Sequence, residues 1–169
     1  MGDKNVEERW PFEGMNSDVV GSTLAEEQKV HISDMLCFAL YSASRAAIDA
    51  YRPLLDELGL TYPQYLVMLV LWERQSCSVK DLGQLLHLDS GTLSPLLKRL
   101  EGVGYIARQR RHSDQRVVDI VLTEEGSNLK MLASPIPQKI SCQYGIEYGE
   151  YRDLLERLKK LTDHLSSPR

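Results

Sequence analysis

Cys37 is the residue of this sequence best suited to chemistry. It lies in the apolar segment "MLCFALYSASRAA" (residues 35–47), and the phenol of Tyr41 follows one helical turn later. A free cysteine in such a segment often packs as a small apolar side chain. In the first turns of a helix it can instead be a nucleophile, because the helix dipole and nearby hydroxyl donors stabilise a thiolate. The segment alone leaves both interpretations open.

Basic residues gather in one part of a chain whose net charge is −4. Residues 90–118 contain six basic and two acidic side chains, so this segment carries +4 and the remainder carries −8. A basic island of this kind can bind phosphate while the rest of the protein repels it. A solvated charged surface is the alternative interpretation.

Two helices are predicted before the basic segment. Apolar residues recur at steps of three and four over residues 31–58, which predicts an amphipathic helix with Ser33 or Asp34 as its N-cap and Gly59 as its end. Thr61 before Pro63 predicts the start of a second helix. This second helix is apolar nearly all round and therefore belongs in the core.

A helix-turn-helix and a β-hairpin are predicted next. Residues 79–88 form a short helix, and Asp89 or Ser90 caps another that ends at Gly102 or Gly104. Residues 105–126, "YIARQRRHSDQRVVDIVLTEEG", alternate apolar and polar side chains around a charged centre at 110–116. A helix-turn-helix followed by a hairpin with a basic tip is typical of a winged helix, whose second helix enters the DNA major groove. The predicted fold is mainly α with a small β-wing, and the predicted partner is double-stranded DNA.

The C-terminal region is predicted to be helical. Thr123 caps a helix that Pro135 and Pro137 interrupt. A last helix, over residues 148–165, carries one apolar stripe: Tyr151, Leu154, Leu155, Leu158, Leu161 and Leu165. The stripe either packs against the first helix of its own chain or pairs with a second subunit, and both can hold together.

Three segments and the wing resemble a known family. "LCFALYSASRA", "LTYPQYLVMLVLWE" and "DSGTLSPLLKRLE", with Asp114 and Arg116 in the wing, resemble the MarR family of dimeric winged-helix repressors. Within it they are most similar to the organic hydroperoxide resistance regulator (OhrR-type) branch. The resemblance covers roughly residues 31–165. It implies a homodimer that binds a palindromic operator and releases it when the signal, an organic hydroperoxide, arrives.

The resemblance also implies roles for the thiols and phenols. The hydroperoxide oxidises Cys37, while Tyr51 and Tyr62 hydrogen-bond that sulfur from the partner subunit and Tyr41 lies close by. Cys142 lies where members of the two-cysteine class carry the resolving cysteine, which forms an intersubunit disulfide. Cys77 matches neither role and is interpreted as a structural or incidental thiol.

The DNA-binding candidates fall into groups by their expected contacts. Thr92 and Ser94, beside Ser90 in the first turn of the recognition helix, are expected to reach base edges. Lys98 and Arg99 are expected to contact phosphates. Arg116 is expected to enter the minor groove, with Asp114 holding its guanidinium or its turn. The remaining candidates are expected to give sequence-independent affinity: Arg108, Arg110 and Arg111.

The pattern of predicted elements and the family resemblance together imply the following organisation. Residues 1–29 are a flexible arm, 30–60 a dimerisation and sensor helix, 61–123 the winged helix-turn-helix domain and 124–169 the C-terminal dimerisation helices. Hydrophobic content of 43% excludes a wholly disordered chain. Three widely spaced cysteines, no signal peptide and no apolar run long enough for a bilayer predict a soluble, cytoplasmic protein without a membrane partner.

Two other functions are compatible with parts of the sequence. One is a MarR-type repressor gated by a small aromatic ligand in the dimer crevice. The other is a thiol peroxidase, but Asp34 is the only acid near Cys37 in sequence, and no histidine forms a recognisable set with the thiol. The protein is therefore predicted not to be an enzyme, and no cofactor is expected. No metal is expected either, since there is no CxxC or HxxxH motif.

Overall fold

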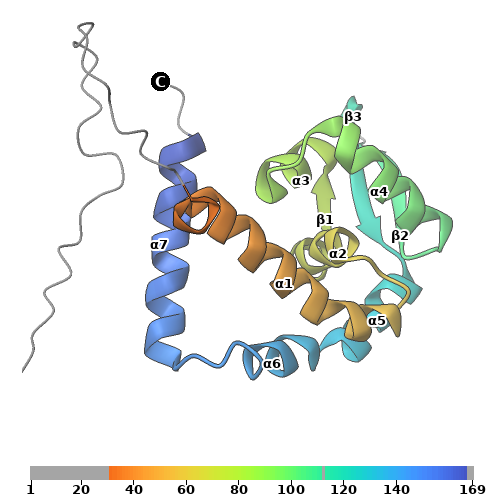
Figure 1. Cartoon of the computed structure of the whole chain (residues 1–169). Helices are drawn as coiled ribbons and strands as arrows, with labels where there is room; N and C mark the ends of the chain where they lie inside the picture. Colours follow the sequence, from red (N-terminus) through yellow and green to blue (C-terminus); the bar gives the residue numbers. More distant parts are fainter. Residues whose placement is uncertain (1–30, 112, 167–169) are drawn as a thin grey trace, which may run out of the picture. The chain divides into compact units, whose positions relative to one another are not determined.

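The computed structural model describes residues 31–111 and 113–166, which are mainly helical with one small antiparallel sheet (Figure 1). This confirms the predicted fold class. The predicted arm of residues 1–29 lies outside the described residues. The chain divides into two compact units, one ending at Ala46 and the other beginning at Ala47, so the boundary falls within the first long helix.

The elements are η1 (Ile32–Asp34), α1 (Leu36–Asp56), α2 (Tyr62–Arg74), β1 (Ser76–Ser78), α3 (Val79–Leu86), α4 (Ser90–Gly102), β2 (Ile106–Arg111), β3 (Asp114–Leu122), α5 (Glu124–Ala133), α6 (Ile136–Ser141) and α7 (Tyr148–Ser166).

The start of α1 differs from the prediction. Ser33 and Asp34 lie in the short 3₁₀-helix η1, where the Ser33 hydroxyl donates to the Asp34 carboxylate at 3.1 Å. The carbonyl of Met35 instead accepts hydrogen bonds from the backbone N–H groups of Phe38 and Ala39. The predicted N-cap is therefore wrong, because the two polar side chains are used locally in the preceding turn. The predicted end is close, since α1 ends at Asp56 and Gly59 has a φ of 65°.

Helix α2 lies at the centre of the hydrophobic core. Thr61 and Gln64 form a capping box at its start, and Tyr65, Met68 and Leu71 are buried along it. Leucines of α3 and α4, together with Ile106 and Ile120 of the sheet, complete the core around it. The predictions that Thr61 begins this helix and that the helix is a core element are both confirmed.

The sheet has the strand order β1-β3-β2, and Figure 1 shows α3 and α4 beside it. Strands β2 and β3 form the predicted hairpin, with a register shift between Arg110 and Arg111. Strand β1 was not predicted; it pairs antiparallel with β3, placing Ser78 opposite Asp119. The three-stranded sheet joins the wing to the beginning of α3, since Ser78 is also the N-cap of that helix.

The helix-turn-helix follows the predicted boundaries. His87 adopts a left-handed conformation at the end of α3, and Asp89 caps α4 by accepting the backbone N–H of Thr92 at 2.9 Å. Thr123 caps α5 in the same way through Gly126. Helix α7 covers the predicted C-terminal helix, and none of its residues is buried.

Candidate DNA interface and thiol site

The first turn of α4 presents three hydroxyl groups, two of which are engaged within the helix. The Thr92 hydroxyl donates to the Asp89 carboxylate at 2.8 Å, and the Ser94 hydroxyl donates to the carbonyl of Ser90 at 2.7 Å. The side-chain and backbone hydrogen bonds from Thr92 lower the pKa of Asp89. Thr92 and Ser94 therefore keep oxygen lone pairs that can accept a hydrogen bond from a donor on a base edge.

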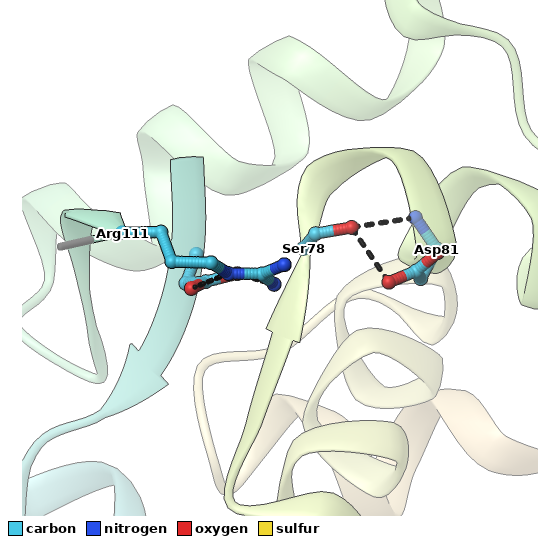
Figure 2. Close-up of polar contacts among 4 residues, drawn as sticks. Ser78, Asp81 and Arg111 are labelled. Carbon is cyan, nitrogen blue, oxygen red and sulfur yellow. Dashed lines mark hydrogen bonds and ion pairs between the residues drawn. The ribbon is translucent and has the colours of Figure 1, made fainter. Parts of the chain in front are cut away.

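The side chain of Arg111 points toward Asp119 on the neighbouring strand β3. Its Nε and one Nη lie 2.9 and 2.6 Å from the two oxygens of the Asp119 carboxylate, a bidentate pair. Figure 2 shows its guanidinium pointing toward Ser78, whose hydroxyl donates to the Asp81 carboxylate at 2.7 Å. The pair lowers the pKa of Asp119 and raises that of Arg111. Arg111 thus holds β2 to β3 and lies close to the first helix of the helix-turn-helix.

The side chain of Arg116 is far more exposed than those of Arg108 and Arg111 in the same hairpin. Its side chain is 95% exposed, and its Nε lies 3.7 Å from an oxygen of Asp114. The same oxygen accepts the backbone N–H of Arg116 at 3.0 Å. Asp114 therefore contacts both the guanidinium and the turn, the two arrangements expected for it.

The other arginines of the hairpin are tied to their neighbours. Arg110 donates to the carbonyl of Gln115 at 3.1 Å, and Arg108 forms an ion pair with Glu101 of α4 at 3.1 Å. Lys98 and Arg99 of α4 are exposed. A cleft of about 850 Å³ separates the wing from α3 and the start of α4, and its lining includes four basic residues: Lys80, Arg108, Arg111 and Arg116.

The three thiols differ in their exposure. Cys37, in the first turn of α1, and Cys142, directly after α6, are exposed, whereas Cys77 is buried in β1. Burial and the nearby Asp81 raise the pKa of Cys77, which keeps this thiol protonated and a poor nucleophile. Cys37 belongs to the first compact unit and Cys142 to the second.

The phenols expected to support the sensor occupy two places. Tyr41, in the first unit with Cys37, is exposed, and the guanidinium of Arg45 lies 5.9 Å from its ring centroid. Tyr51 and Tyr62 are half-buried in the second unit, with ring centroids 4.9 Å apart. Burial raises the pKa of both phenols, so both remain O–H donors.

Tyr144, which was not predicted as a site residue, also affects the pKa of these phenols. A side-chain hydrogen bond with Tyr144 further raises the pKa of Tyr51. The available signal was its position two residues after Cys142. Periodicity could not find it, because Tyr144 lies in the connection between α6 and α7.

The described ranges hold neither a metal-binding cluster nor a membrane-spanning helix. Within residues 31–111 and 113–166, no cluster of three or more histidine, cysteine or acidic side chains is arranged to hold a metal ion. No helix in that part of the chain combines the length and apolar character needed to cross a membrane.

Known proteins resemble this chain in both sequence and structure. A family model described as transcriptional regulator SarA/Rot matches residues 49–131. The HTH-type transcriptional regulator TtmR of Methylorubrum extorquens is 45% identical over 146 residues, which is 86% of this chain and 75% of that protein. The organic hydroperoxide resistance transcriptional regulator of Bacillus subtilis is 51% identical over 109 residues, covering 64% of this chain and 74% of that protein.

The similar solved structures include that of AbfR of Staphylococcus epidermidis. It is 37% identical, with a TM-score of 0.67 over 79% of this chain and 92% of that one. Further structures of AbfR, each 36% identical, are described as reduced and bound to DNA (TM-score 0.66) and as disulfide-formed (TM-score 0.56). With these relatives, the winged helix-turn-helix and the segments around Cys37, the chain belongs to the MarR family of winged-helix transcriptional regulators, in its OhrR-like branch.

Proposed function

We propose that this regulator binds a palindromic operator as a homodimer and releases it when an organic hydroperoxide oxidises Cys37. The observation that carries the proposal is the exposed thiol of Cys37 in the first turn of α1, in a chain 51% identical over 109 residues to an organic hydroperoxide resistance regulator. AbfR, which has been described in reduced DNA-bound and disulfide-formed states, supports the link between thiol state and DNA.

The first chemical step is a two-electron oxidation of Cys37. Its thiolate attacks one peroxide oxygen, an S–O bond forms and the O–O bond breaks, and the alkoxide leaves and takes a proton to become an alcohol. The product is a sulfenic acid. The exposed apolar side chains of Leu36 and Phe38 flank the thiol in sequence and favour an alkyl hydroperoxide over hydrogen peroxide.

The second step forms a disulfide with Cys142 of the partner subunit. The Cys142 thiolate attacks the sulfenic sulfur, an S–S bond forms, and the departing hydroxide takes a proton to become water. A disulfide requires the two Cα atoms to come within about 7 Å. If the two cysteines start farther apart, forming the disulfide moves the segments that carry them. We expect that movement to change the positions of the two wings.

On DNA, α4 enters the major groove and the wing contacts the adjacent minor groove. Thr92 and Ser94 accept hydrogen bonds from base edges, and Lys98 and Arg99 contact phosphates. Arg116, 95% exposed, enters the minor groove. Arg108 and Arg110 add sequence-independent affinity, and Arg111 contributes less because Asp119 already holds its guanidinium.

The Cys37→Ser variant tests the signal. Serine keeps nearly the size of the thiol but cannot become a sulfenic acid, so the variant should bind operator DNA like the parent and stay bound when cumene hydroperoxide is added. Fluorescence anisotropy with labelled operator measures both properties, and Cys77→Ser is the control that should respond like the parent. Release of Cys37→Ser by hydroperoxide would contradict the proposal. Release of a cysteine-free variant by a small aromatic acid would support the ligand-gated alternative.

The Cys142→Ser variant tests the second step. Cys37 should still be oxidised, but no covalent dimer should appear on non-reducing gels, because the resolving thiol is absent. Mass spectrometry after trapping with dimedone detects the sulfenic acid. A covalent dimer that persists in Cys142→Ser would assign the bridge to Cys77 or to a symmetric pair of Cys37 residues.

A further inference from the structure

The ladder between β2 and β3 is interrupted toward the tip of the wing. Arg110 of β2 is paired with Val118 of β3, whereas the next residue, Arg111, is paired with Asp114. Residues 115–117 of β3 therefore lie between the partners of two successive residues of β2 and form a bulge, the wing bulge. A bulge disrupts the ladder locally and re-aims the side chains that it carries.

Arg116 is the central residue of the wing bulge. Its backbone N–H donates to the Asp114 carboxylate at 3.0 Å, and its own side chain is 95% exposed. Next to it, the guanidinium of Arg110 donates to the carbonyl of Gln115 at 3.1 Å. Both hydrogen bonds are exposed to water, which competes for the same groups, so each adds little net stability.

The ion pair of Arg111 with Asp119 spans the wing bulge. Arg111 is paired through its backbone with Asp114, which precedes the bulge, but its guanidinium reaches Asp119, which follows the bulge. The Nε and one Nη lie 2.9 and 2.6 Å from the two carboxylate oxygens. Two such hydrogen bonds fix the orientation of a guanidinium as well as its distance. The pair therefore ties the two ends of the bulge together.

Asp119 is held in the middle of the sheet. It is paired with Gln109 of β2 on one side and with Ser78 of β1 on the other. Ser78 is the N-cap of α3, since its hydroxyl accepts the backbone N–H of Asp81 at 3.1 Å and donates to that residue's carboxylate at 2.7 Å. Figure 2 shows the Arg111 guanidinium pointing toward Ser78. Through Asp119, the wing bulge is thus joined to the first helix of the helix-turn-helix.

We propose that Arg111 and Asp119 are positioning residues that hold the wing bulge so that Arg116 meets the minor groove while α4 occupies the major groove. The inference rests on the proposed function, in which Arg116 enters that groove. Without the pair, the charge of Arg116 remains but its direction varies. The specific operator then loses affinity, whereas binding to random DNA does not.

The Asp119→Asn variant opposes this role to simple electrostatics. It removes a negative charge from the wing, which by itself would strengthen binding to every duplex. We expect instead that full-length Asp119→Asn binds the operator about three- to tenfold more weakly, a smaller loss than for Arg116→Ala. Its affinity for a random duplex should be unchanged or higher. Fluorescence anisotropy measures both affinities, with a labelled operator that the parent has selected from a pool of random duplexes.

The Arg111→Lys variant tests the other member of the pair. Lysine keeps the positive charge but cannot form the bidentate contact. The variant should lose operator affinity as Asp119→Asn does, while the salt slope on random DNA stays that of the parent. An Arg111 that acted only by its charge on phosphate would tolerate lysine, and unchanged operator binding by Arg111→Lys would therefore overturn the inference.

Two controls separate positioning from a general effect on folding. Glu101→Gln removes a carboxylate from another ion pair of the hairpin, that with Arg108, which lies outside the wing bulge. It should keep the parent's preference for the operator over random DNA. In an Arg116→Ala background, Asp119→Asn should cause no further loss at the operator, because the side chain that the pair positions is gone.

The outcomes distinguish the inference from the proposed function. If Arg116→Ala weakens operator binding and Asp119→Asn does not, the inference is overturned and the proposed function stands. The inference is also overturned by a loss that is equal on operator and random DNA, that persists in the Arg116→Ala background or that appears equally in Glu101→Gln. If Arg116→Ala binds the operator like the parent, the minor-groove contact of the proposed function and the inference both fail.

Discussion

Arg111 and Arg116 lie five residues apart in one hairpin, but they differ in how many of their guanidinium N–H groups are already bonded within the protein. Arg111 gives two N–H groups to Asp119, whereas Arg116 is 95% exposed with Asp114 at its side. An exposed ion pair adds little to stability, but it fixes the position of the guanidinium. The paired arginine therefore shapes the wing, and the exposed one is available to DNA.

This difference gives a prediction for operator binding. Arg116→Ala should weaken binding to the specific operator by about 1–3 kcal/mol and relax specificity at the contacted position. Arg110→Ala should weaken binding to all DNA about equally and reduce the salt slope by about 1, because a phosphate contact carries no sequence information. Anisotropy titrations of specific and random duplexes at several salt concentrations measure both effects. Identical behaviour of the two variants would remove the special role of Arg116.

Most of the helices and the hairpin could be predicted from the sequence, because their local signals are strong. Periodicity and capping residues such as Thr61, Asp89 and Thr123 located the helices from α2 to α5, and alternation located the hairpin. The prediction failed where a partner distant in sequence decides. Strand β1 has three residues, too few to show alternation, and it exists because β3 pairs with it.

The same limit applies to the candidate site. The basic residues and the thiols could be identified in the sequence, but the exposure of Cys37 and Cys142 and the contacts of the side chains could not. The pairing of Arg111 with Asp119 depends on the register of the hairpin, which places Asp119 opposite Gln109 and so diagonally across from Arg111. The contact of Tyr51 with Tyr144 joins residues that are far apart in the chain.

A close approach at the start of α5 gives a prediction for stability. A Cβ at Gly126 would collide with the carbonyl of Tyr105, while the carbonyl of Gly126 accepts the indole N–H of Trp72 at 2.8 Å. Gly126→Ala should therefore lower the free energy of unfolding by about 1–3 kcal/mol, the usual cost of overpacking. Gly102→Ala is the matched control, since a Cβ there meets no atom within 4 Å, and it should be neutral or stabilising. Urea denaturation followed by circular dichroism measures both, and equal stability of the two variants would contradict the prediction.

At the scale of the whole molecule, α7 presents an apolar stripe that the single chain leaves exposed. Tyr151, Leu154 and Leu158 are 38%, 49% and 38% exposed, and no residue of the helix is buried. An exposed apolar stripe along one helix is typical of an interaction site. Of the two alternatives left by the sequence, a second subunit is the one that the proposed function requires.

The oligomeric state therefore gives a further prediction, which joins this surface to DNA binding. The double variant Leu154→Glu/Leu158→Glu places two charges on the stripe, so it should shift the protein from dimer to monomer at micromolar concentration in sedimentation equilibrium. Lys159→Glu, a charge change on the same helix outside the stripe, should leave the dimer intact. Each subunit offers one recognition helix, and the two half-sites of a dimer lie about one helical turn apart. The monomeric variant should consequently lose specific operator binding while keeping weak, salt-sensitive binding to any duplex through its intact wing. A dimeric double variant, or a monomer that binds the operator as tightly as the parent, would show that α7 does not hold the two wings in register.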